Sequence, residues 1–499
     1  MSDTERFNSG AWGDLGGGYY RNPVLMADFS DPDVIRVGED FYMVCSEFHY
    51  MGMPVLHSND LVNWTIIGQV YDRLDIDPRY DRMDGYGAGS WAPAIRYHNG
   101  LFYVYFCTPN EGLYMSTARD PSGPWSPLHE VKRVSAWEDP CPFWDDDGNA
   151  YLGRSITGAG PIVIHRMSLD GKRLLDEGVI VYVGKTAEGT KIYKKDGYYY
   201  LIIPEGGVST GWQTALRSKS IYGPYERRVV LQQGRTEING PHQGGLVDTP
   251  SGEWWFMHFQ SSGAKGRVCH LQPVQWVDGW PIMGSDCEPV SVFRKPEVST
   301  KRVEVLQTSD DFSSTKLGLQ WQWNHNPVDD HWSLTERPGY LRIRAMKACG
   351  IRTARNTVTQ KLIGNKGVIT VELSIAGMAT GQQAGLTYLG ADFDNWIGVE
   401  KDDSGVRISS VTAGTHCHGP AVDCDTVWLR TQYDFEGSTL MYFSVDGIRF
   451  WQLGGECQLT FGFWKGARVG LFTYNKSCDG GIADFARFTY EHDGPSMQE

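Results

Sequence analysis

Three acidic residues occupy comparable positions in the chain, each a few residues before a glycine that ends a polar turn. Asp139 and Glu188 lie nine residues before their glycines, and Asp31 lies seven residues before its own. Two carboxyl groups can cleave a glycosidic bond when one, deprotonated, activates water and the other, protonated, donates to the leaving oxygen. A third negative charge nearby raises the pKa of the donor and helps to keep it protonated. The spacing therefore indicates acid–base chemistry on sugars, provided that the fold brings the three acids together.

The three acids belong to a repeated unit, which reads as an apolar strand, a polar turn ending in glycine and an aromatic-rich strand. The turn glycines are separated by 62, 48, 49 and 55 residues and are Gly38, Gly100, Gly148, Gly197 and Gly252. Asn-Gly and Asp-Gly before a strand are strong hairpin signals. Further strand-like segments follow these hairpins, so each unit of about 50 residues holds four short strands. Five such units predict a five-bladed β-propeller over residues 22–292.

The remainder of the chain divides into three parts. Residues 1–21 form an N-terminal segment, and the polar residues 293–307 read as a linker. Strands with a period of two follow over residues 308–499, at about ten-residue spacing and without helical periodicity, which is typical of a β-sandwich. The predicted fold class is therefore all-β, a five-bladed propeller followed by a sandwich of the jelly-roll kind.

A propeller explains why strands would begin with acids. The first strand of each blade lines the central channel, so equivalent positions at its start converge at one end of the axis. Trp91 and Gln243 also lie nine residues before their glycines and should join the three acids there. The alternative is that acids at strand starts cap turns or bind a structural cation. Among other acids, Asp33 shares a strand face with Asp31 and could be the base, and Glu205 could be the acid from the rim of the pocket.

Composition and charge exclude several classes of function. The net charge of −14 argues against nucleic acid or an anionic membrane as the partner. The first residues, MSDTERFNSG, do not resemble a secretory signal, and no run of 18 apolar residues suggests a membrane span. Ten cysteines stand singly, without zinc-site spacing, which favours reduced thiols. We therefore expect a cytoplasmic protein.

Four stretches carry a resemblance to a known family: NPVLMADFSDPDVIRVGEDFYM, SWAPAIRYHNGLFYVYF, EDPCPFWDDDGNAYL and AEGTKIYKKDGYYYL. In this order they resemble glycoside hydrolase family 43, the β-xylosidase and α-L-arabinofuranosidase family, whose members are five-bladed and invert the anomeric centre. The resemblance implies that Asp31 is the general base, Glu188 the general acid, and Asp139 the group that orients the acid and tunes its pKa. Inversion places the base and acid carboxyls roughly 6.5–9.5 Å apart, with room for water.

The resemblance extends to substrate-binding residues and to a metal. Arg267 matches a family arginine that hydrogen-bonds the sugar, while Trp91 and Phe48 are candidate walls of the first sugar subsite. Many members hold Ca²⁺ on the propeller axis through a histidine, but here that position is Gln243, with His242 adjacent. A carboxamide oxygen suits Ca²⁺, so a structural calcium ion at Gln243 is predicted, with water as the alternative filling.

The C-terminal part resembles the concanavalin-like sandwich of the family's xylosidases through FSVDGIRFW and VGLFTYN…GGIADFARFTY. In those relatives a loop of this domain helps to close the active site, and an aromatic residue of the loop is replaced here by Arg468. Otherwise the domain could add stability, bind carbohydrate at its own site or support a homo-oligomer.

The expected function is an exo-acting, inverting glycosidase that releases xylose or arabinofuranose from small oligosaccharides, without a cofactor in the chemistry. Two rivals stay open. One is an endo-arabinanase or a galactan-cleaving relative, which a cleft open at both ends would favour. The other is a non-catalytic carbohydrate-binding propeller whose acids only bind cations.

Overall fold

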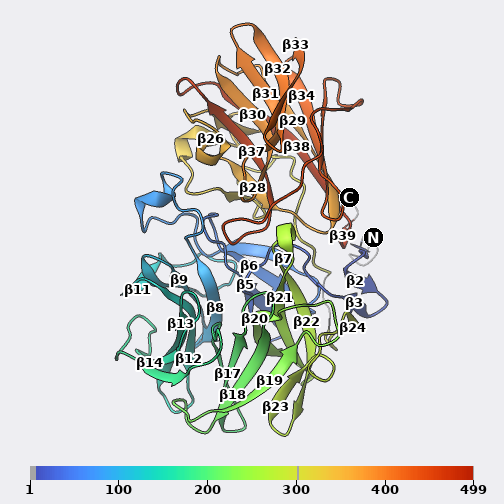
Figure 1. The fold of residues 1–499 in the computed structure, drawn as a ribbon. Coiled ribbons are helices and arrows are strands. Elements are labelled where there is room, and N and C mark those ends of the chain that lie inside the picture. The colour runs from blue at the N-terminus through green and yellow to red at the C-terminus, as the bar shows by residue number, and fades with distance from the viewer. Residues whose placement is uncertain (1–6, 300–302, 498–499) are drawn as a thin grey trace.

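The computed structural model describes residues 7–299 and 303–497. Within these ranges the chain forms β-strands and short 3-10 turns, without an α-helix. Figure 1 shows two bodies, a propeller at the bottom and a sandwich at the top, as the all-β prediction requires. No helix in the described ranges has the length and apolar character needed to cross a membrane.

The propeller consists of five four-stranded antiparallel sheets in the described residues, each made of consecutive strands. The strands of blades 1 and 2 are β4 (Asp33–Val37), β5 (Asp40–Val44), β6 (Pro54–Ser58), β7 (Thr65–Gln69), β8 (Trp91–His98), β9 (Leu101–Thr108), β10 (Gly112–Ala118) and β11 (His129–Arg133). Those of blades 3 to 5 are β12 (Trp137–Trp144), β13 (Ala150–Ile156), β14 (Ile162–Met167), β15 (Val179–Tyr182), β16 (Lys191–Lys195), β17 (Tyr198–Glu205), β18 (Trp212–Ser218), β19 (Glu226–Gln232), β20 (His242–Asp248), β21 (Trp254–Ser261), β22 (Arg267–Val277) and β23 (Trp280–Met283).

The turns between the first two strands of each blade follow the sequence signals. Asn99-Gly100 and Asp196-Gly197 form two-residue hairpin turns with positive φ at both positions, 49° and 79° in the first and 51° and 72° in the second. This geometry suits Asn-Gly and Asp-Gly because their twist matches that of the flanking strands. Blades 3 and 5 differ, since their turns span residues 145–149 and 249–253. These longer turns shift the spacing from turn to strand start.

The ring closes by packing between blades. The inner strands β4, β8 and β12 pack in sequence, and β20 of blade 5 packs against β4 of blade 1. At this junction Arg36 forms an ion pair with Asp248 at 2.6 Å. The centre of the ring is polar: the fully buried Lys191 donates from Nζ to the Pro93 carbonyl at 3.0 Å, and Asp33 forms an ion pair with Arg96 at 2.6 Å. Contacts between inner strands therefore set the positions of their starts.

The sandwich packs two seven-stranded antiparallel sheets, as described within residues 303–497. The first sheet runs in the order β25 (Gln322–Trp323), β28 (Val358–Lys361), β37 (Arg468–Asn475), β30 (Gln382–Leu389), β31 (Asn395–Asp402), β32 (Gly405–Thr412) and β33 (Thr415–Val422). The second runs in the order β26 (Trp332–Ser333), β27 (Leu341–Arg344), β38 (Ile482–His492), β29 (Lys366–Ser374), β34 (Thr426–Asp434), β35 (Leu440–Ser444) and β36 (Trp451–Gln452).

Small elements connect the two bodies. Of these, β1 (Phe7–Asn8) pairs with β39 (Ser496–Met497), which joins the two ends of the chain. The other small elements are the sheet of β2 (Gly13–Gly16), β3 (Tyr19–Arg21) and β24 (Val292–Arg294), and the 3-10 turns η2 (Pro78–Tyr80), η3 (Gly263–Lys265), η4 (Asp329–His331) and η5 (Ile351–Thr353). The boundaries proposed from the sequence stay predictions. The structure adds that the N-terminal segment and the start of the linker share one sheet, because β3 pairs with β24.

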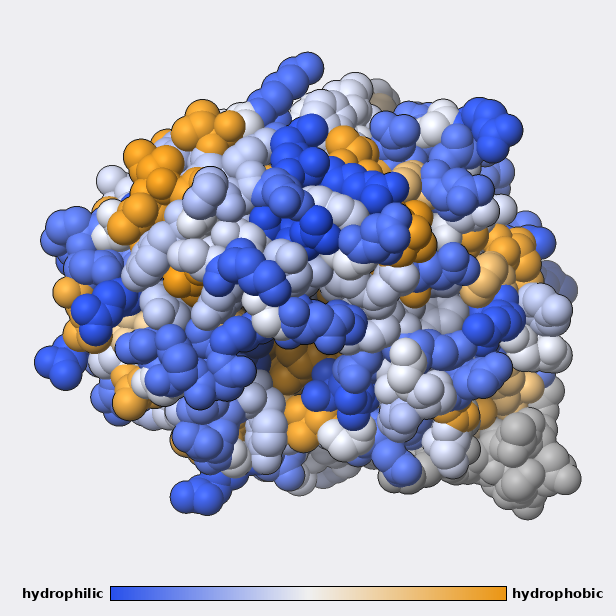
Figure 2. Space-filling model, turned by 90° about the horizontal axis from the view of Figure 1, so that it is seen from below, coloured by the Kyte–Doolittle hydropathy of each residue, from blue (hydrophilic) through white to orange (hydrophobic). Residues whose placement is uncertain are grey.

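The bodies meet through a buried network of charges. Glu47 of the propeller accepts from Lys361 at 2.6 Å and from Arg468 at 2.7 Å, and the Lys465 ammonium lies 2.8 Å from Asp28. Removing one partner of such a buried pair costs about 3–5 kcal/mol, since the other charge is left uncompensated. The network therefore fixes how the sandwich sits on the propeller. On the propeller face that points away from the sandwich, hydrophobic residues form small groups between hydrophilic ones (Figure 2).

Candidate active site

A pocket of about 290 Å³ lies where the inner strands of the blades begin. The structure brings all seven sequence-predicted site residues to this pocket: Asp31, Phe48, Trp91, Asp139, Glu188, Gln243 and Arg267. Its lining also includes residues that the sequence reasoning did not select, above all Glu138 and Trp464, together with His242. The pocket is therefore the candidate active site.

A residue with positive φ lies near the start of each inner strand, at the level of the pocket. These residues are Asp31 (55°), Ala92 (41°), Asp139 (57°), Gly189 (65°) and Gln243 (31°). Irregularities in strand pairing follow or surround them in blades 2, 3 and 5. Such bulges commonly re-aim side chains next to active sites. Position 189 requires glycine for two reasons. A Cβ there would lie 2.6 Å from the Pro204 side chain, and the positive φ is one that residues with a side chain rarely adopt.

This alignment corrects the nine-residue count. Measured from the turn glycine, the positive-φ residue lies nine positions back in blades 3 and 5, where the turns are longer, but eight in blades 2 and 4. Glu188 therefore corresponds to the residue before the positive-φ position, and its true equivalents are Trp91, Glu138 and His242. Two sets of positions therefore surround the pocket: the positive-φ residues and the residues just before them. Counting back from the turn glycines placed members of both sets in a single set.

Asp31 is held by three side-chain donors. Ser46 Oγ donates to Asp31 Oδ2 at 2.6 Å, Ser30 Oγ donates to the same oxygen at 2.8 Å, and Arg267 Nη1 donates to Oδ1 at 3.0 Å. Asp31 is 4% exposed and lines the pocket. Arg267 is itself placed by its stacking over Phe259, with the guanidinium 4.8 Å from the ring centre. Asp31 and Arg267 therefore act as one oriented unit.

Asp139, like Asp31, is held by three donors. It accepts from Ser155 Oγ, from the Gly189 backbone N–H at 2.7 Å and from Gln243 Nε2 at 2.7 Å. Burial first, and the charge of Glu188 second, raise the pKa of Asp139. Because it binds the backbone directly after Glu188, Asp139 holds that residue in place. This contact supports the orienting role predicted for it.

Glu138 is a buried acid that the sequence reasoning missed. Its carboxyl lies within 4.8 Å of those of Asp139 and Glu188, and the Ala159 N–H donates to it over a long 3.5 Å. Burial, followed by the charges of Asp139 and Glu188, raises the pKa of Glu138. Asp139 has three donors, whereas Glu138 has one weak one. The signal was present in the sequence as the Glu-Asp pair of WEDP.

Glu188 faces a histidine. His242 Nε2 lies 2.8 Å from Glu188 Oε1, and the His242 ring packs against Phe259 with 5.2 Å between ring centres. The Glu188 side chain is 15% exposed, more than those of Asp31 and Asp139, so it can reach a bound molecule. Glu188 is thus the most accessible of the clustered acids.

The two rival acids lie elsewhere. Asp33 is fully buried and engaged by Arg96, with the nitrogen and oxygen 2.6 Å apart. Glu205 accepts from Arg227 at 2.6 Å and from Thr214 at 2.5 Å, and Tyr182 donates to its other oxygen. Neither contributes to the lining of the pocket. Both carboxylates are buried and paired with arginines, so a structural role accounts for them and no catalytic role is needed.

Aromatic rings from both domains form the walls. Phe48 and Trp91 meet edge to face with centroids 5.7 Å apart, and Trp464 of the sandwich meets Trp91 at 6.1 Å. Aromatic walls of this kind suit the apolar faces of a sugar. Trp464 is 49% exposed and belongs to a hairpin turn, Gly462–Lys465, whose end residues exchange two backbone hydrogen bonds of 3.0 Å. Phe463 and Trp464 both have positive φ, 54° and 66°.

The Trp464 turn is strained and anchored. Bulky residues rarely adopt positive φ, and such strain persists when the surroundings over-determine it. Here the buried Lys465 donates to the Ser46 carbonyl at 3.1 Å and pairs with Asp28. Arg468, which the resemblance suggested as the replacement of a loop aromatic, is fully buried over Tyr50 and does not line the pocket. The aromatic contribution of the second domain therefore comes from Trp464, four residues earlier.

Gln243 uses one end of its carboxamide. Its Nε2 donates to Asp139, whereas its Oε1 is buried without a hydrogen-bond partner. The calcium ion stays a prediction. Ca²⁺ takes six to eight oxygen ligands, roughly, and the Asp139 carboxylate is already occupied by three donors. An ion at Gln243 would take most of its ligands from water.

Replacing Trp464 with alanine is expected to lower kcat/KM on a disaccharide by about five-fold, because an aromatic contact is worth about 1 kcal/mol beyond its buried area. The loss should fall mainly on KM, since Trp464 is a wall of the pocket and not one of its acids. Steady-state kinetics measure it. Trp451→Ala is the matched control, since Trp451 is an equally exposed tryptophan (45%) of the same domain. Equal kinetics for the two variants would remove Trp464 from the site.

Comparisons with known proteins agree with this arrangement. The sequence model described as glycosyl hydrolases family 43 matches residues 20–281, and the one described as a beta xylosidase C-terminal concanavalin A-like domain matches residues 309–491. A putative beta-xylosidase from Xylanibacter ruminicola is 53% identical over 473 residues, covering 93% of this chain and 88% of its own. A non-reducing end alpha-L-arabinofuranosidase from Bacteroides ovatus is 33% identical over 65% of both chains.

A solved structure extends the agreement to three dimensions. The crystal structure of a GH43 protein from Bacillus licheniformis superposes with a TM-score of 0.85 at 30% identity, over 95% of this chain and 99% of that one. Both domains are included in this overlap. The chain therefore belongs to glycosyl hydrolases family 43, and it is a glycoside hydrolase.

Proposed function

We propose that this protein is an inverting exo-glycosidase that releases single xylose units from the ends of short xylo-oligosaccharides. The observation that carries the proposal is the place of Trp464, which brings the second domain to a pocket that already holds the acids. A pocket walled on one side accepts the end of a chain, whereas endo action needs a cleft open at both ends. The beta-xylosidase name of the Xylanibacter ruminicola relative supports the choice of sugar.

The two acids at the pocket would divide the reaction. Asp31 removes a proton from water as the water oxygen bonds to the anomeric carbon, and Glu188 gives its proton to the glycosidic oxygen as the bond from that oxygen to carbon breaks. The products are the free sugar and the shortened alcohol. Asp31 then loses its proton to solvent, and Glu188 regains one from His242 or from solvent. The net reaction consumes one water.

The neighbouring residues keep these groups in position. Arg267 and the two serines hold the Asp31 carboxylate, and Asp139 holds the backbone beside Glu188. Positioning of this kind lowers the barrier because the reacting groups need not be ordered during the reaction. Arg267 has further donors that can reach a sugar hydroxyl at the pocket edge.

A second candidate is the release of arabinofuranose, which the name of the Bacteroides ovatus relative favours. Both sugars are pentoses with similar hydroxyl groups, so one pocket can serve either. The test is proton NMR during turnover of xylobiose and of an aryl α-L-arabinofuranoside. We expect xylose to appear first as its α-anomer, and arabinose to be released more slowly.

Other outcomes of this experiment discriminate between the rivals. The β-anomer of xylose appearing first would contradict inversion and the base role of Asp31. Release of arabinose alone would change the proposed substrate from xylosides to arabinofuranosides and would leave the proposed mechanism unchanged. Products longer than one sugar from a polymer would support endo action, and binding of oligosaccharides without any turnover would support a non-catalytic propeller.

A further inference from the structure

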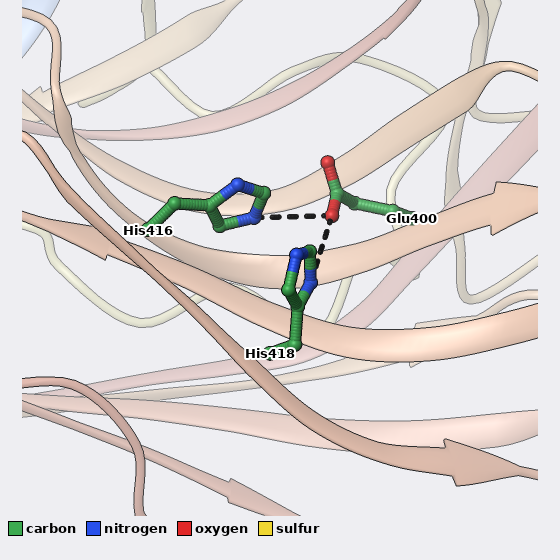
Figure 3. A group of neighbouring side chains, drawn as sticks. All are labelled: Glu400, His416 and His418. Carbon is green, nitrogen blue, oxygen red and sulfur yellow. Dashed lines mark ion pairs between the residues drawn. The ribbon is translucent and has the colours of Figure 1, made fainter.

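Two histidines on the outer face of the sandwich lie beside a glutamate, far along the chain from the catalytic acids. His416 and His418 stand two positions apart on β33, so their side chains project from the same face of the strand. Glu400 lies on β31, and β32 runs between the two strands. Figure 3 shows both imidazole rings turned toward the Glu400 carboxylate. The three residues form a cluster on the first sheet of the sandwich.

The donor atoms of this cluster are already close together. His416 Nε2 lies 3.1 Å from Glu400 Oε2, and His418 Nδ1 lies 3.7 Å from the same oxygen. All three donor atoms fall within 4.8 Å of one another. In a tetrahedral zinc site with bonds of about 2.0–2.2 Å, neighbouring ligand atoms are about 3.3 Å apart. Small side-chain rotations would therefore bring the three atoms around one ion.

The glutamate is fixed from beneath by buried polar groups. Ser409 Oγ donates to Glu400 Oε2 at 2.8 Å, and Gln383 Nε2 donates to Oε1. The Tyr474 hydroxyl donates in turn to Gln383 Oε1. Ser409 and Gln383 are both buried, whereas an exposed salt bridge would leave the carboxylate free to rotate. Outer partners that orient a ligating side chain are a regular feature of metal sites.

The remaining contacts leave room for an ion. Lys476 Nζ lies 3.6 Å from the other carboxylate oxygen, Oε1, so it does not occupy the space between the histidines. The side chains of His416 and His418 are 39% and 52% exposed, so a hydrated ion can reach them. Their rings lie 4.2 Å apart between centroids. With three protein ligands, a fourth position would be open to water.

We propose that Glu400, His416 and His418 bind a divalent transition-metal ion, with Zn²⁺ as the best match. Two imidazole nitrogens and one carboxylate oxygen are the donors that suit zinc, whereas Ca²⁺ and Mg²⁺ take oxygen ligands. β33 is the edge strand of its sheet, and the ion would tie it to β31 across β32. The site is structural and separate from the reaction at the propeller.

The test is calorimetric titration of the chelator-treated full-length protein with ZnCl₂, together with thermal unfolding at micromolar zinc. We expect one saturable Zn²⁺ per chain and a higher Tm with zinc. His416→Ala and His418→Ala should each weaken binding beyond the roughly 10–100-fold that loss of an outer partner costs, and Ser409→Ala should fall within that range. An excess of Ca²⁺ should not displace the zinc.

The matched control is His331→Ala, because His331 is a histidine of the same domain, paired with Asp330 at 2.6 Å. It should bind zinc as the unmodified protein does. The proposal is overturned if zinc does not bind at micromolar concentration. It is also overturned if both His416→Ala and His418→Ala bind zinc normally, since the ion would then sit elsewhere, for example on the carboxyls of Glu138, Asp139 and Glu188. Circular dichroism verifies that each variant is folded.

Discussion

Asp31→Asn is expected to lower kcat on xylobiose by about 10²–10⁴-fold, the usual contribution of a general base. The asparagine side chain has the same shape, but its single carbonyl oxygen can replace only one of the two carboxylate oxygens that accept from Ser46 and Arg267, and it cannot take a proton from water. Removal of the charge also leaves the Arg267 guanidinium buried without its carboxylate. A loss of stability is therefore expected as well, and the rate must be expressed per folded molecule. Steady-state kinetics combined with thermal unfolding separate the two effects.

Asp33→Asn is the control that makes this prediction sharp. Asp33 lies two residues away and is buried against Arg96, much as Asp31 is against Arg267. Its replacement should cost similar stability and leave kcat within a few-fold, because Asp33 does not line the pocket. If Asp33→Asn eliminated turnover and Asp31→Asn retained it, the assignment of the base would be reversed.

The fold was predictable because its signals are local and repeated. Asn99-Gly100 and Asp196-Gly197 form the hairpin turns that their dipeptides indicate, and the aromatic-rich strands follow at once. From the same regularity we predicted that Asp31, Asp139 and Glu188 share one pocket, and all three line the pocket in the structure. Alignment of the repeats by their turn glycines gave wrong equivalences where the turns differ in length. Glu138 was missed because the five-residue turn of blade 3 moves it onto the level of Glu188.

Trp464 could not be found by the same reasoning. Its turn has Phe463 and Trp464 at the two positive-φ positions, where turn rules expect glycine, asparagine or aspartate. The turn is held instead by contacts between residues about 420–440 positions apart, such as Lys465 with Asp28 and Ser46. Local sequence patterns do not predict such contacts between residues that are distant along the chain. Strain at this turn, once seen, is the sign that it serves a site.

Glu188→Gln is expected to reduce turnover of xylobiose by about 10²–10⁴-fold, and that of a dinitrophenyl β-xyloside by about ten-fold or less. A sugar alcohol is a poor leaving group and needs a proton as the bond breaks, whereas a dinitrophenolate leaves without one. The glutamine cannot supply this proton, although it keeps the shape of the side chain and its approach to His242. The measurement is the ratio of kcat/KM on the two substrates, compared between variant and parent.

Only the leaving-group dependence separates an acid from a residue that merely shapes the pocket. Glu205→Gln provides the comparison, since Glu205 is a buried glutamate of the same blade that is held by Arg227. It should lower stability and leave the substrate ratio unchanged. Equal losses of Glu188→Gln on both substrates would mean that Glu188 does not protonate the leaving oxygen. The neighbouring Glu138, whose pKa is raised by burial and by adjacent charges, would then be the next candidate for the acid.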